Sequence, residues 1–206
     1  MFKNNKPIIV FEGIDCSGKS HHISFISKFL DSQKIKYIKI REPGGNPNSE
    51  KIRRLLLNNN SKFNSKTDLL LYMSARSENI TLIKKFYKKK IILIDRFTDS
   101  TIAYQHYGMG IDLKFIKMIN DYLLGNIKVN FTFLNIVNKK NLLLRLKMRK
   151  KLNRYDKFDI NFYNKVQNGY LKLRNYKKKS YQVVNSNLSI KVNENLILDQ
   201  IKRLIK

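Results

Sequence analysis

The sequence contains a single cysteine, Cys16, so neither a disulfide framework nor a cysteine-based metal site is available to it. It also lacks any run of about 18 apolar residues that could cross a membrane. Its N-terminus lacks the basic-then-apolar pattern of a secretory signal. We therefore expect a soluble, cytoplasmic protein with no membrane partner.

Acidic residues are scarce: 15 Asp and Glu stand against 42 Lys and Arg, which gives a net charge of +27. An excess of this size would normally suggest nucleic acid as a partner. The lysines, however, are spread along the whole chain together with many Asn and Ile residues, and no zinc pattern, basic-heptad region or RNP aromatic motif accompanies them. We expect no specific nucleic-acid partner, only weak binding of polyanions in low salt.

At 206 residues the chain is long enough for one α/β domain with a substantial core. Apolar runs bounded by turn signals predict strands at 8–11, 37–40, 91–94, 131–137 and 181–184. Helical spacing predicts helices at 19–30, 49–57, 68–87, 113–124, 139–150, 159–173 and 193–205. This alternation is typical of a five-stranded parallel sheet with helices on both faces, and residues 1–206 are predicted to form a single domain. The polar stretch 58–66 and the charged stretch 150–159 are predicted to be mobile.

A phosphate-binding motif follows the first predicted strand: Gly-Ile-Asp-Cys-Ser-Gly-Lys-Ser at residues 13–20. Its small residues let backbone N–H groups turn around phosphate oxygens, and the following helix directs its positive end at them. Lys19 is expected to reach the β- and γ-phosphates, and the Ser20 hydroxyl to bind Mg²⁺. We expect the loop to bind ATP through Gly13, Ile14, Asp15, Cys16, Ser17, Gly18, Lys19 and Ser20. The motif alone predicts an NTP site and leaves the reaction open.

Charged residues also follow the second and third predicted strands, as Arg-Glu-Pro-Gly-Gly at 41–45 and as the segment that begins with Asp95 and Arg96. Ligands of open α/β sheets gather at the carboxyl ends of the strands. Between these segments Tyr72 and Arg76 are four residues apart, so they share one helix face and could read a base. Taken singly, Tyr72 could instead be a core residue and Asp95-Arg96 a structural ion pair.

Together these segments resemble the bacterial type of thymidylate kinase, in the same order and at similar spacings. The resemblance rests on the phosphate loop, the 41–45 segment, Ser-Ala-Arg at 74–76, the run 93–105 and Asn-Arg-Tyr-Asp at 153–156, which looks like the family's lid. It implies a nucleoside monophosphate kinase with the P-loop NTPase fold, a short mobile lid at about 148–158 and Mg²⁺ as cofactor. The implied reaction moves the γ-phosphoryl of ATP onto dTMP, giving dTDP on the route to dTTP. The resemblance also implies a homodimer.

Residue roles follow from the same resemblance. It implies that Arg53 and Arg96 clamp the acceptor phosphate, that Asp15 and Glu42 lie on the sugar and metal side, and that Asp95 organises Mg²⁺ through water. Tyr72 would stack on thymine, Arg76 would bond its edge, Thr101 and Gln105 would complete base recognition, and Tyr104 would exclude a ribose 2′-hydroxyl. The catalytic set is Asp15, Lys19, Arg96, Arg149 and Arg154.

The lid must supply a cation, because Cys16 stands where some members of the family place a loop arginine. Arg149 and Arg154 are the candidates, since a planar guanidinium matches phosphate oxygens better than the point charge of Lys150 or Lys151. Arg154 matches the family's lid motif, so we expect it to be catalytic.

The sequence departs from the family at two places: Tyr72 stands where phenylalanine is usual, and Asn135 stands where acidic residues are common. Two other functions remain open at this point. A deoxynucleoside kinase shares the architecture but needs a carboxylate base beside the substrate hydroxyl. A basic nucleic-acid-binding protein with a vestigial nucleotide fold is favoured by charge alone.

Overall fold

The computed structural model describes residues 6–149 and 152–205 and contains one five-stranded parallel sheet. The strand order is β2-β3-β1-β4-β5. The strands are β1 Ile8–Gly13, β2 Tyr37–Arg41, β3 Ile91–Asp95, β4 Phe131–Ile136 and β5 Tyr181–Asn185. All five strands predicted from apolar runs are therefore confirmed, each within two residues at either end.

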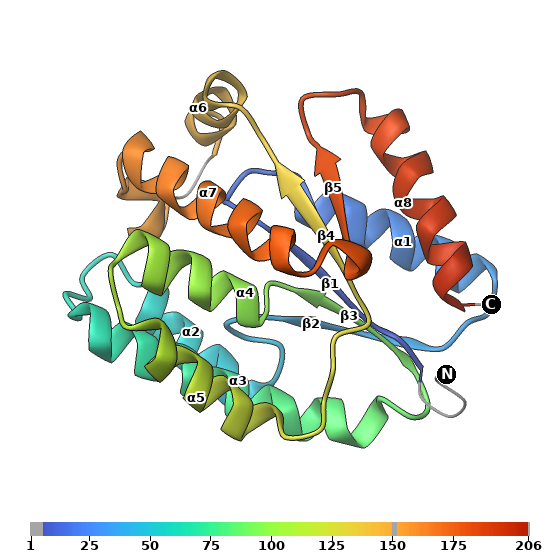
Figure 1. The fold of residues 1–206 in the computed structure, drawn as a ribbon, viewed down its shortest axis with the longest axis horizontal. Coiled ribbons are helices and arrows are strands. Elements are labelled where there is room, and N and C mark those ends of the chain that lie inside the picture. Colours follow the sequence, from blue (N-terminus) through green and yellow to red (C-terminus); the bar gives the residue numbers. More distant parts are fainter. Residues whose placement is uncertain (1–5, 150–151, 206) are drawn as a thin grey trace.

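Helices cover both faces of the sheet (Figure 1). The α-helices are α1 Lys19–Ser32, α2 Pro47–Leu57, α3 Ser65–Phe86, α4 Thr98–Thr101, α5 Leu113–Leu124, α6 Lys139–Lys147, α7 Ile160–Tyr176 and α8 Ile190–Ile205. Three further turns are the π-helix η1 Ile102–Gly108 and the 3₁₀ helices η2 Arg154–Lys157 and η3 Lys178–Ser180.

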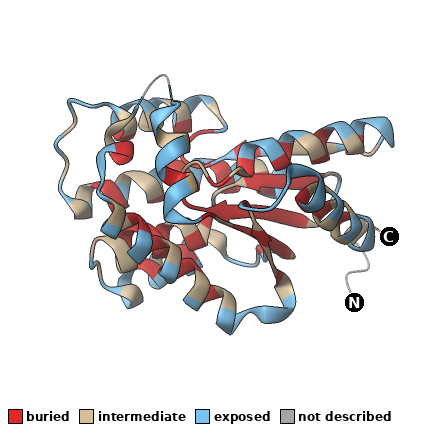
Figure 2. Ribbon diagram, turned by 90° about the horizontal axis from the view of Figure 1, so that it is seen from above, coloured by how far each residue is buried: buried red, intermediate tan, exposed pale blue. Residues whose placement is uncertain are grey.

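Strand β1 shows why two separate cores form. Successive side chains of a strand point to opposite faces. Ile9 and Phe11 pack with α1 and α8, whereas Ile8 and Val10 pack with α3. All four side chains are buried, so the strand reads as a continuous apolar run, as expected for a parallel strand covered on both sides. Figure 2 shows the buried residues concentrated in the strands and on the inner faces of the helices.

The segment after β3 differs from the prediction, which contained no helix there. Residues 98–108 form α4 and then η1, and this helical segment packs against α7. Gly108 and Gly169 permit the contact: a Cβ on Gly108 would lie 2.7 Å from the Phe162 ring, and one on Gly169 would lie 2.5 Å from the Tyr107 ring. Such close packing depends on a partner more than 50 residues away, which local periodicity does not reveal.

The lid region also differs. Helix α6 ends at Lys147, three residues before its predicted end, and η2 occupies part of the stretch predicted to be mobile. Asn153 and Asp156 form a reciprocal capping box that stabilises this turn. The predictions made for Lys150 and Lys151 lie outside the described residues. Within the described ranges, no helix is long and apolar enough to cross a membrane.

Candidate active site

The phosphate loop joins β1 to α1 through three residues with positive φ: Gly13 at +135°, Cys16 at +57° and Gly18 at +91°. Gly13 is required by space as well as by φ, because a Cβ there would lie 2.2 Å from the backbone oxygen of Asn135 on β4. The loop therefore passes close to β4 and places the N-terminus of α1 at the carboxyl edge of the sheet. A helix N-terminus in this position attracts anions.

Lys19 begins α1, and its side chain folds back over the loop. Its Nζ donates to the carbonyl oxygens of Gly13 at 3.1 Å and Ile14 at 2.8 Å. Burial, with a contribution from the nearby Arg96, lowers the pKa of Lys19 to about 8. A bound phosphate would offer the ammonium a stronger partner than these two carbonyls, since hydrogen bonds between charged groups are the stronger ones.

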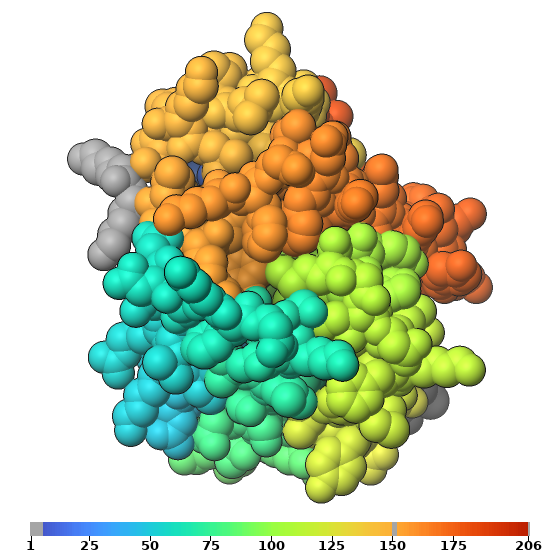
Figure 3. All heavy atoms as spheres, turned by 90° about the vertical axis from the view of Figure 1, so that its left-hand side faces the viewer, coloured from blue at the N-terminus to red at the C-terminus, as the bar shows by residue number. Residues whose placement is uncertain are grey.

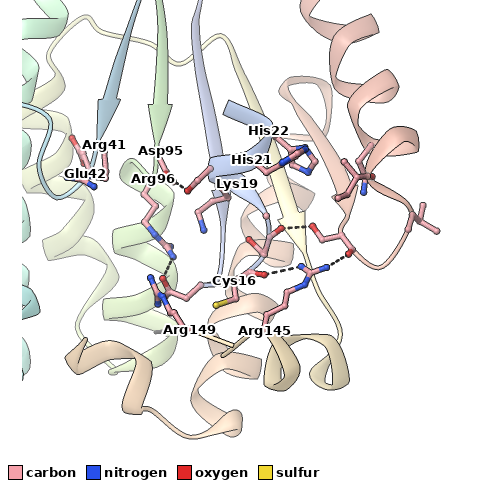
Figure 4. A pocket seen from close by; sticks show the side chains of 18 of the residues that line it. Cys16, Lys19, His21, His22, Arg41, Glu42, Asp95, Arg96, Arg145 and Arg149 are labelled. Atoms are coloured by element: carbon pink, nitrogen blue, oxygen red, sulfur yellow. Dashed lines mark hydrogen bonds and ion pairs between the residues drawn. The ribbon is translucent and has the colours of Figure 1, made fainter. Parts of the chain in front are cut away.

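Ser20 and Asp95 lie side by side at the ends of α1 and β3. The Ser20 hydroxyl donates to Asp95 Oδ2 at 3.3 Å, and Asp95 Oδ1 is buried with no hydrogen-bond partner (Figure 4). Mg²⁺ prefers oxygen ligands and commonly takes only one or two from protein, with waters and phosphates supplying the rest. The orphaned Asp95 oxygen and the Ser20 hydroxyl therefore fit a magnesium site.

Two cavities adjoin the loop. The larger, of about 650 Å³, runs along the phosphate loop toward α6 and the start of α8 (Figure 4). The smaller, of about 80 Å³, lies between η1, α3 and the lid. Five residues line both cavities: Asp15, Glu42, Arg53, Arg96 and Arg149. Three cations and two carboxylates thus meet at the point where the cavities join.

Arg96 is the best fixed of these cations. Its Nη2 donates to Asp15 Oδ1 at 2.9 Å and its Nη1 to the Gly13 carbonyl oxygen at 2.8 Å. Asp15 Oδ2 accepts the Tyr104 hydroxyl at 2.7 Å. Burial disfavours the Asp15 charge, but Arg96, Lys19 and the Tyr104 hydroxyl together hold the pKa of this carboxyl well below its usual range. Asp15 is therefore a permanent hydrogen-bond acceptor at neutral pH.

The smaller cavity contains the predicted base-reading residues. Tyr72, Arg76, Thr101, Tyr104 and Gln105 all line it. The side-chain nitrogen of Gln105 is buried with no hydrogen-bond partner, so this residue retains a donor for a ligand. The ring of Tyr72 lies edge-to-face with Tyr155 of η2, with centroids 6.0 Å apart.

Arg76 and Glu42 form the most deeply buried ion pair among the residues that line this cavity. Arg76 is 2% exposed, and its Nε and Nη2 donate to Glu42 Oε2 at 2.9 and 2.6 Å. Its Nη1 donates to Asn120 Oδ1 at 2.6 Å. Each terminal nitrogen carries two hydrogens, so one N–H of Nη2 remains for a base. Burial raises the pKa of Glu42 although Arg76 and Asn79 stabilise its charge.

The two lid arginines have different positions. Arg149 lines both cavities, is 38% exposed and pairs with Asp156. Arg154 lines neither. It is paired with Asp68 of α3, and its Nε donates to the Leu56 carbonyl oxygen at 3.1 Å. In Figure 3 the lid segment lies against the segment between α2 and α3.

The comparison with protein families decides the relationship of the chain, because the family model for thymidylate kinase matches residues 11–197. The chain belongs to the thymidylate kinase family. Relatives named thymidylate kinase include one from Kosmotoga olearia, 33% identical over 92% of each chain, and one from Thermosipho africanus, 40% identical over 80% of this chain and 83% of that one. A crystal structure of thymidylate kinase from Ehrlichia chaffeensis matches with a TM-score of 0.78 and 28% identity, over 96% of this chain and 98% of that one.

Membership of the thymidylate kinase family confirms the resemblance seen in the sequence, and the structure brings most of the predicted site residues together. Asp15–Ser20 and Asp95 line the larger cavity, and the acceptor residues line the smaller one. Gly13 and Ile14 line neither cavity, and the Ile14 side chain is buried in the core. One placement differs from what the resemblance implied, because Arg154 lies outside both cavities. Glu42 is paired with Arg76 and lines both cavities, the larger one together with Ser20 and Asp95.

Several residues of the larger cavity were not predicted from the sequence, among them Arg145. Arg145 on α6 donates from Nη1 to the Cys16 carbonyl oxygen at 3.0 Å and from Nη2 to the Ser186 carbonyl oxygen at 2.7 Å. It thereby ties α6 to the phosphate loop and to the loop before α8. A sequence signal existed: Arg145 and Arg149 are four residues apart, which places them on one face of the helix predicted over 139–150, although α6 ends at Lys147.

Proposed function

We propose that the chain catalyses the reaction of the thymidylate kinase family, the transfer of the γ-phosphoryl group of ATP to dTMP, mainly by stabilising charge. The observation that carries this proposal is the junction of the two cavities, where Arg53, Arg96 and Arg149 converge. Two polyanions must approach each other for the transfer, and negative charge spreads over the transferring group. Preorganised cations at that point lower the barrier.

The larger cavity holds ATP, with its phosphates on the loop and α1. Lys19 leaves the Gly13 and Ile14 carbonyls to bind the β- and γ-phosphates. Ser20 and the orphaned oxygen of Asp95 would hold Mg²⁺, directly or through water. The ion, when bound, would neutralise charge on the phosphate oxygens.

The smaller cavity holds dTMP. Arg53 and Arg96 bind its phosphate at the junction, the Tyr72 ring stacks on thymine, and Arg76 and Gln105 bond the base edge. Thr101 completes the pocket. Tyr104 lies where a ribose 2′-hydroxyl would be and is fixed by its bond to Asp15.

No general base takes part. The acceptor is a phosphate monoester, which is ionised near neutral pH and needs no deprotonation before attack. Both carboxylates at the junction form ion pairs with arginines, Asp15 with Arg96 and Glu42 with Arg76. A deoxynucleoside kinase would need a free carboxylate beside a hydroxyl. The pairing therefore favours a nucleoside monophosphate as the acceptor.

Arg149 supplies the lid cation. It lines both cavities, and its half-exposed side chain can move from Asp156 to the transferring group. Arg154 keeps the lid in place through Asp68 and the carbonyl oxygen of Leu56. This proposal replaces the catalytic role that the sequence motif suggested for Arg154.

We also propose a homodimer that forms through α3 and α5. Four large apolar side chains on these helices are exposed: Leu70, Phe115, Met118 and Tyr122, the last at 86%. A patch of this kind marks an interaction surface in many proteins. Sedimentation of the protein and of Met118→Glu tests the proposal: a dimer that becomes a monomer supports it, and a wild-type monomer contradicts it.

The activity test is an ADP-release assay with ATP and Mg²⁺ that compares dTMP, dUMP, thymidine and no acceptor, with Lys19→Ala as the inactive control. We expect dTMP to give the highest kcat/KM. A preference for thymidine would identify a deoxynucleoside kinase. Absence of turnover with every acceptor, together with tight, sequence-independent DNA binding at physiological salt, would favour the nucleic-acid-binding alternative.

A further inference from the structure

Glu12 is a buried carboxylate directly behind the active site. It stands on β1 one residue before Gly13, is 1% exposed and lines neither of the two cavities described above. It borders instead a separate cavity of about 220 Å³, together with Asp99, Lys177 and Tyr181. Ionising a carboxylate in such a place is unfavourable unless hydrogen bonds stabilise the charge, so its partners indicate what the residue does.

Glu12 holds the backbone that follows Arg96. Its Oε1 accepts the backbone N–H of Phe97 at 2.8 Å and that of Ser100 at 3.2 Å. Arg96 itself has φ +66°, in the left-handed region that non-glycine residues rarely adopt. The bond to Phe97 thus fixes the peptide next to a strained residue whose side chain enters the active site.

A second path joins Glu12 to the Arg96 guanidinium. Arg96 Nη1 donates to the Tyr170 hydroxyl at 3.4 Å, the Tyr170 and Ser100 hydroxyls are 2.7 Å apart, and Ser100 Oγ donates to Glu12 Oε2 at 2.5 Å. A guanidinium can only donate. Tyr170 can therefore accept from Arg96 and donate to Ser100, while Ser100 donates to Glu12. In this arrangement each hydrogen of the path points from Arg96 toward Glu12.

This direction depends on the charge of Glu12. Oε1 already accepts two N–H groups, so a proton taken up by Glu12 would sit on Oε2 and point at Ser100. The Ser100 hydrogen would then turn toward Tyr170, and the hydrogen of the buried Tyr170 hydroxyl would lose its acceptor. An unsatisfied buried donor is unfavourable, so the path to Arg96 would be disrupted.

We propose that ionised Glu12 is a positioning residue for Arg96, and that proton uptake by Glu12 lowers the use of dTMP. This inference rests on the proposed function, in which Arg96 binds the acceptor phosphate. The group that changes charge is therefore outside the substrate site and acts through the peptide after Arg96 and through Ser100 and Tyr170.

The groups around Glu12 place its titration near physiological pH. Burial, and then the charge of Asp99, raise the pKa of Glu12 to about 7, while the bonds from Ser100 and Phe97 and the charge of Arg96 oppose the rise. Asp99 is in turn paired with Lys177, with Nζ and Oδ1 3.2 Å apart. Other ionisable groups nearby are Lys19 on α1, whose pKa Glu12 helps to raise, and Tyr170 on α7, whose pKa lies well above its usual value.

The first experiment measures kcat/KM for dTMP from about pH 5.5 to 8.5 at saturating ATP, in the wild type, Asp99→Asn and Lys177→Ala. Removing the Asp99 charge should move the acid limb of the profile to lower pH by about one unit, the lower end of the effect of a neighbouring charge. Removing Lys177 should move it up. The dTMP phosphate titrates equally in all three proteins. Only a difference between their pH profiles therefore reports on Glu12. Superimposable profiles would overturn the proposal.

The second experiment uses Glu12→Gln at pH 8, with Glu78→Gln as the matched control on the exposed side of α3. The amide presents N–H groups to Ser100, so kcat/KM for dTMP should fall about tenfold to a hundredfold, as small misplacements in active sites do. The KM of ATP should stay constant. The thermal midpoint should change little, because losing the buried charge offsets the cost of the unsatisfied hydrogen bond. A merely structural Glu12 would instead lower kcat/KM and the thermal midpoint together.

Wild-type constants in Glu12→Gln would refute the inference. If Glu12→Gln does not fold, the pH profiles of the Asp99 and Lys177 variants decide alone. If the wild type does not phosphorylate dTMP, the proposed function itself fails. If the wild type does so and the variants behave like it, only the role of Glu12 fails.

Discussion

The two cavities are built in different ways. The larger cavity lies along one continuous stretch, residues 15–22, whose backbone N–H groups and Lys19 suit phosphate oxygens. The smaller cavity shares only Asp15 with that stretch; the rest of its lining comes from distant segments, and its polar groups are bonded to one another, as in the Arg76–Glu42 pair. The groups expected to bind the nucleotide therefore come mainly from one segment, whereas those expected to bind the acceptor are brought together by the fold. Mutations should affect the two substrates separately.

The largest expected effect contrasts the two lid arginines. Arg149→Ala should lower kcat at least a hundredfold, because it removes a cation from the transferring group, with little change in folding stability. Arg154→Ala should leave kcat within a few-fold but lower the free energy of unfolding by roughly 3 kcal/mol, because Asp68 keeps a poorly solvated charge without its partner.

Steady-state kinetics and urea denaturation of both variants check this contrast, with Lys147→Ala at the end of α6 as the control. The reverse result, a catalytic defect in Arg154→Ala with an active Arg149→Ala, would restore the role that the sequence motif suggested.

Arg76→Ala should affect the acceptor alone. A charge-assisted hydrogen bond contributes about 1.5–3 kcal/mol, so the KM of dTMP should rise about tenfold to a hundredfold while that of ATP stays constant. The variant should also be less stable, because Glu42 is left buried without its cation.

The double variant Arg76→Ala/Glu42→Gln separates the two effects. It should recover stability but not dTMP binding, as measured by denaturation and by titration calorimetry. Equal losses for ATP and dTMP in the single variant would contradict the assignment of Arg76 to the base.

The thymine methyl group should have a smaller effect. One methyl group in an apolar pocket contributes about 1 kcal/mol, so kcat/KM for dUMP should be roughly fivefold lower than for dTMP. Competition between the two acceptors measures this ratio directly. Complete exclusion of dUMP would show that the cavity reads the base by more than stacking and one arginine.

The smallest effect is expected at Tyr72. Tyr72→Phe should change the KM of dTMP by less than about threefold, because the stacking ring is retained. Burial raises the pKa of Tyr72 to about 12, so its hydroxyl is neutral and adds no charge to the cavity. Tyr72→Ala is the matched contrast: loss of stacking should weaken dTMP by about 1–3 kcal/mol. Equal behaviour of the two variants would show that Tyr72 does not stack on the base.

The elements that the sequence predicted well are those with strong local patterns. The strands are short apolar runs, and α5 begins and ends at the predicted residues 113 and 124. The segment 98–108 was missed as a helix because its packing against α7 depends on Gly108 and Gly169 far away in the sequence. The end of α6 was placed three residues too late and the turn η2 was not predicted, because a charged stretch without an apolar face gives no periodic signal.

The candidate site likewise contains residues that local motifs identify and residues whose roles depend on distant partners. Lys19, Ser20 and Asp95 were found where the motif and the strand ends place them. The motif also pointed to Arg154, although Asp68 of α3 binds that side chain. Arg145 was missed because its partners are backbone oxygens of Cys16 and Ser186, and no motif marks a carbonyl group.

The sequence by itself determined the succession of the five strands along the chain, the positions of most of the helices, the phosphate loop and the family, because each of these depends on neighbouring residues and on their spacing. Only the tertiary structure decided which charges meet: Arg149 and not Arg154 lies at the junction of the cavities, and Glu42 lies against Arg76. Electrostatic and hydrogen-bonding partners act over a few ångströms in space. Distance along the chain does not fix that separation; the packing of the helices on the sheet does.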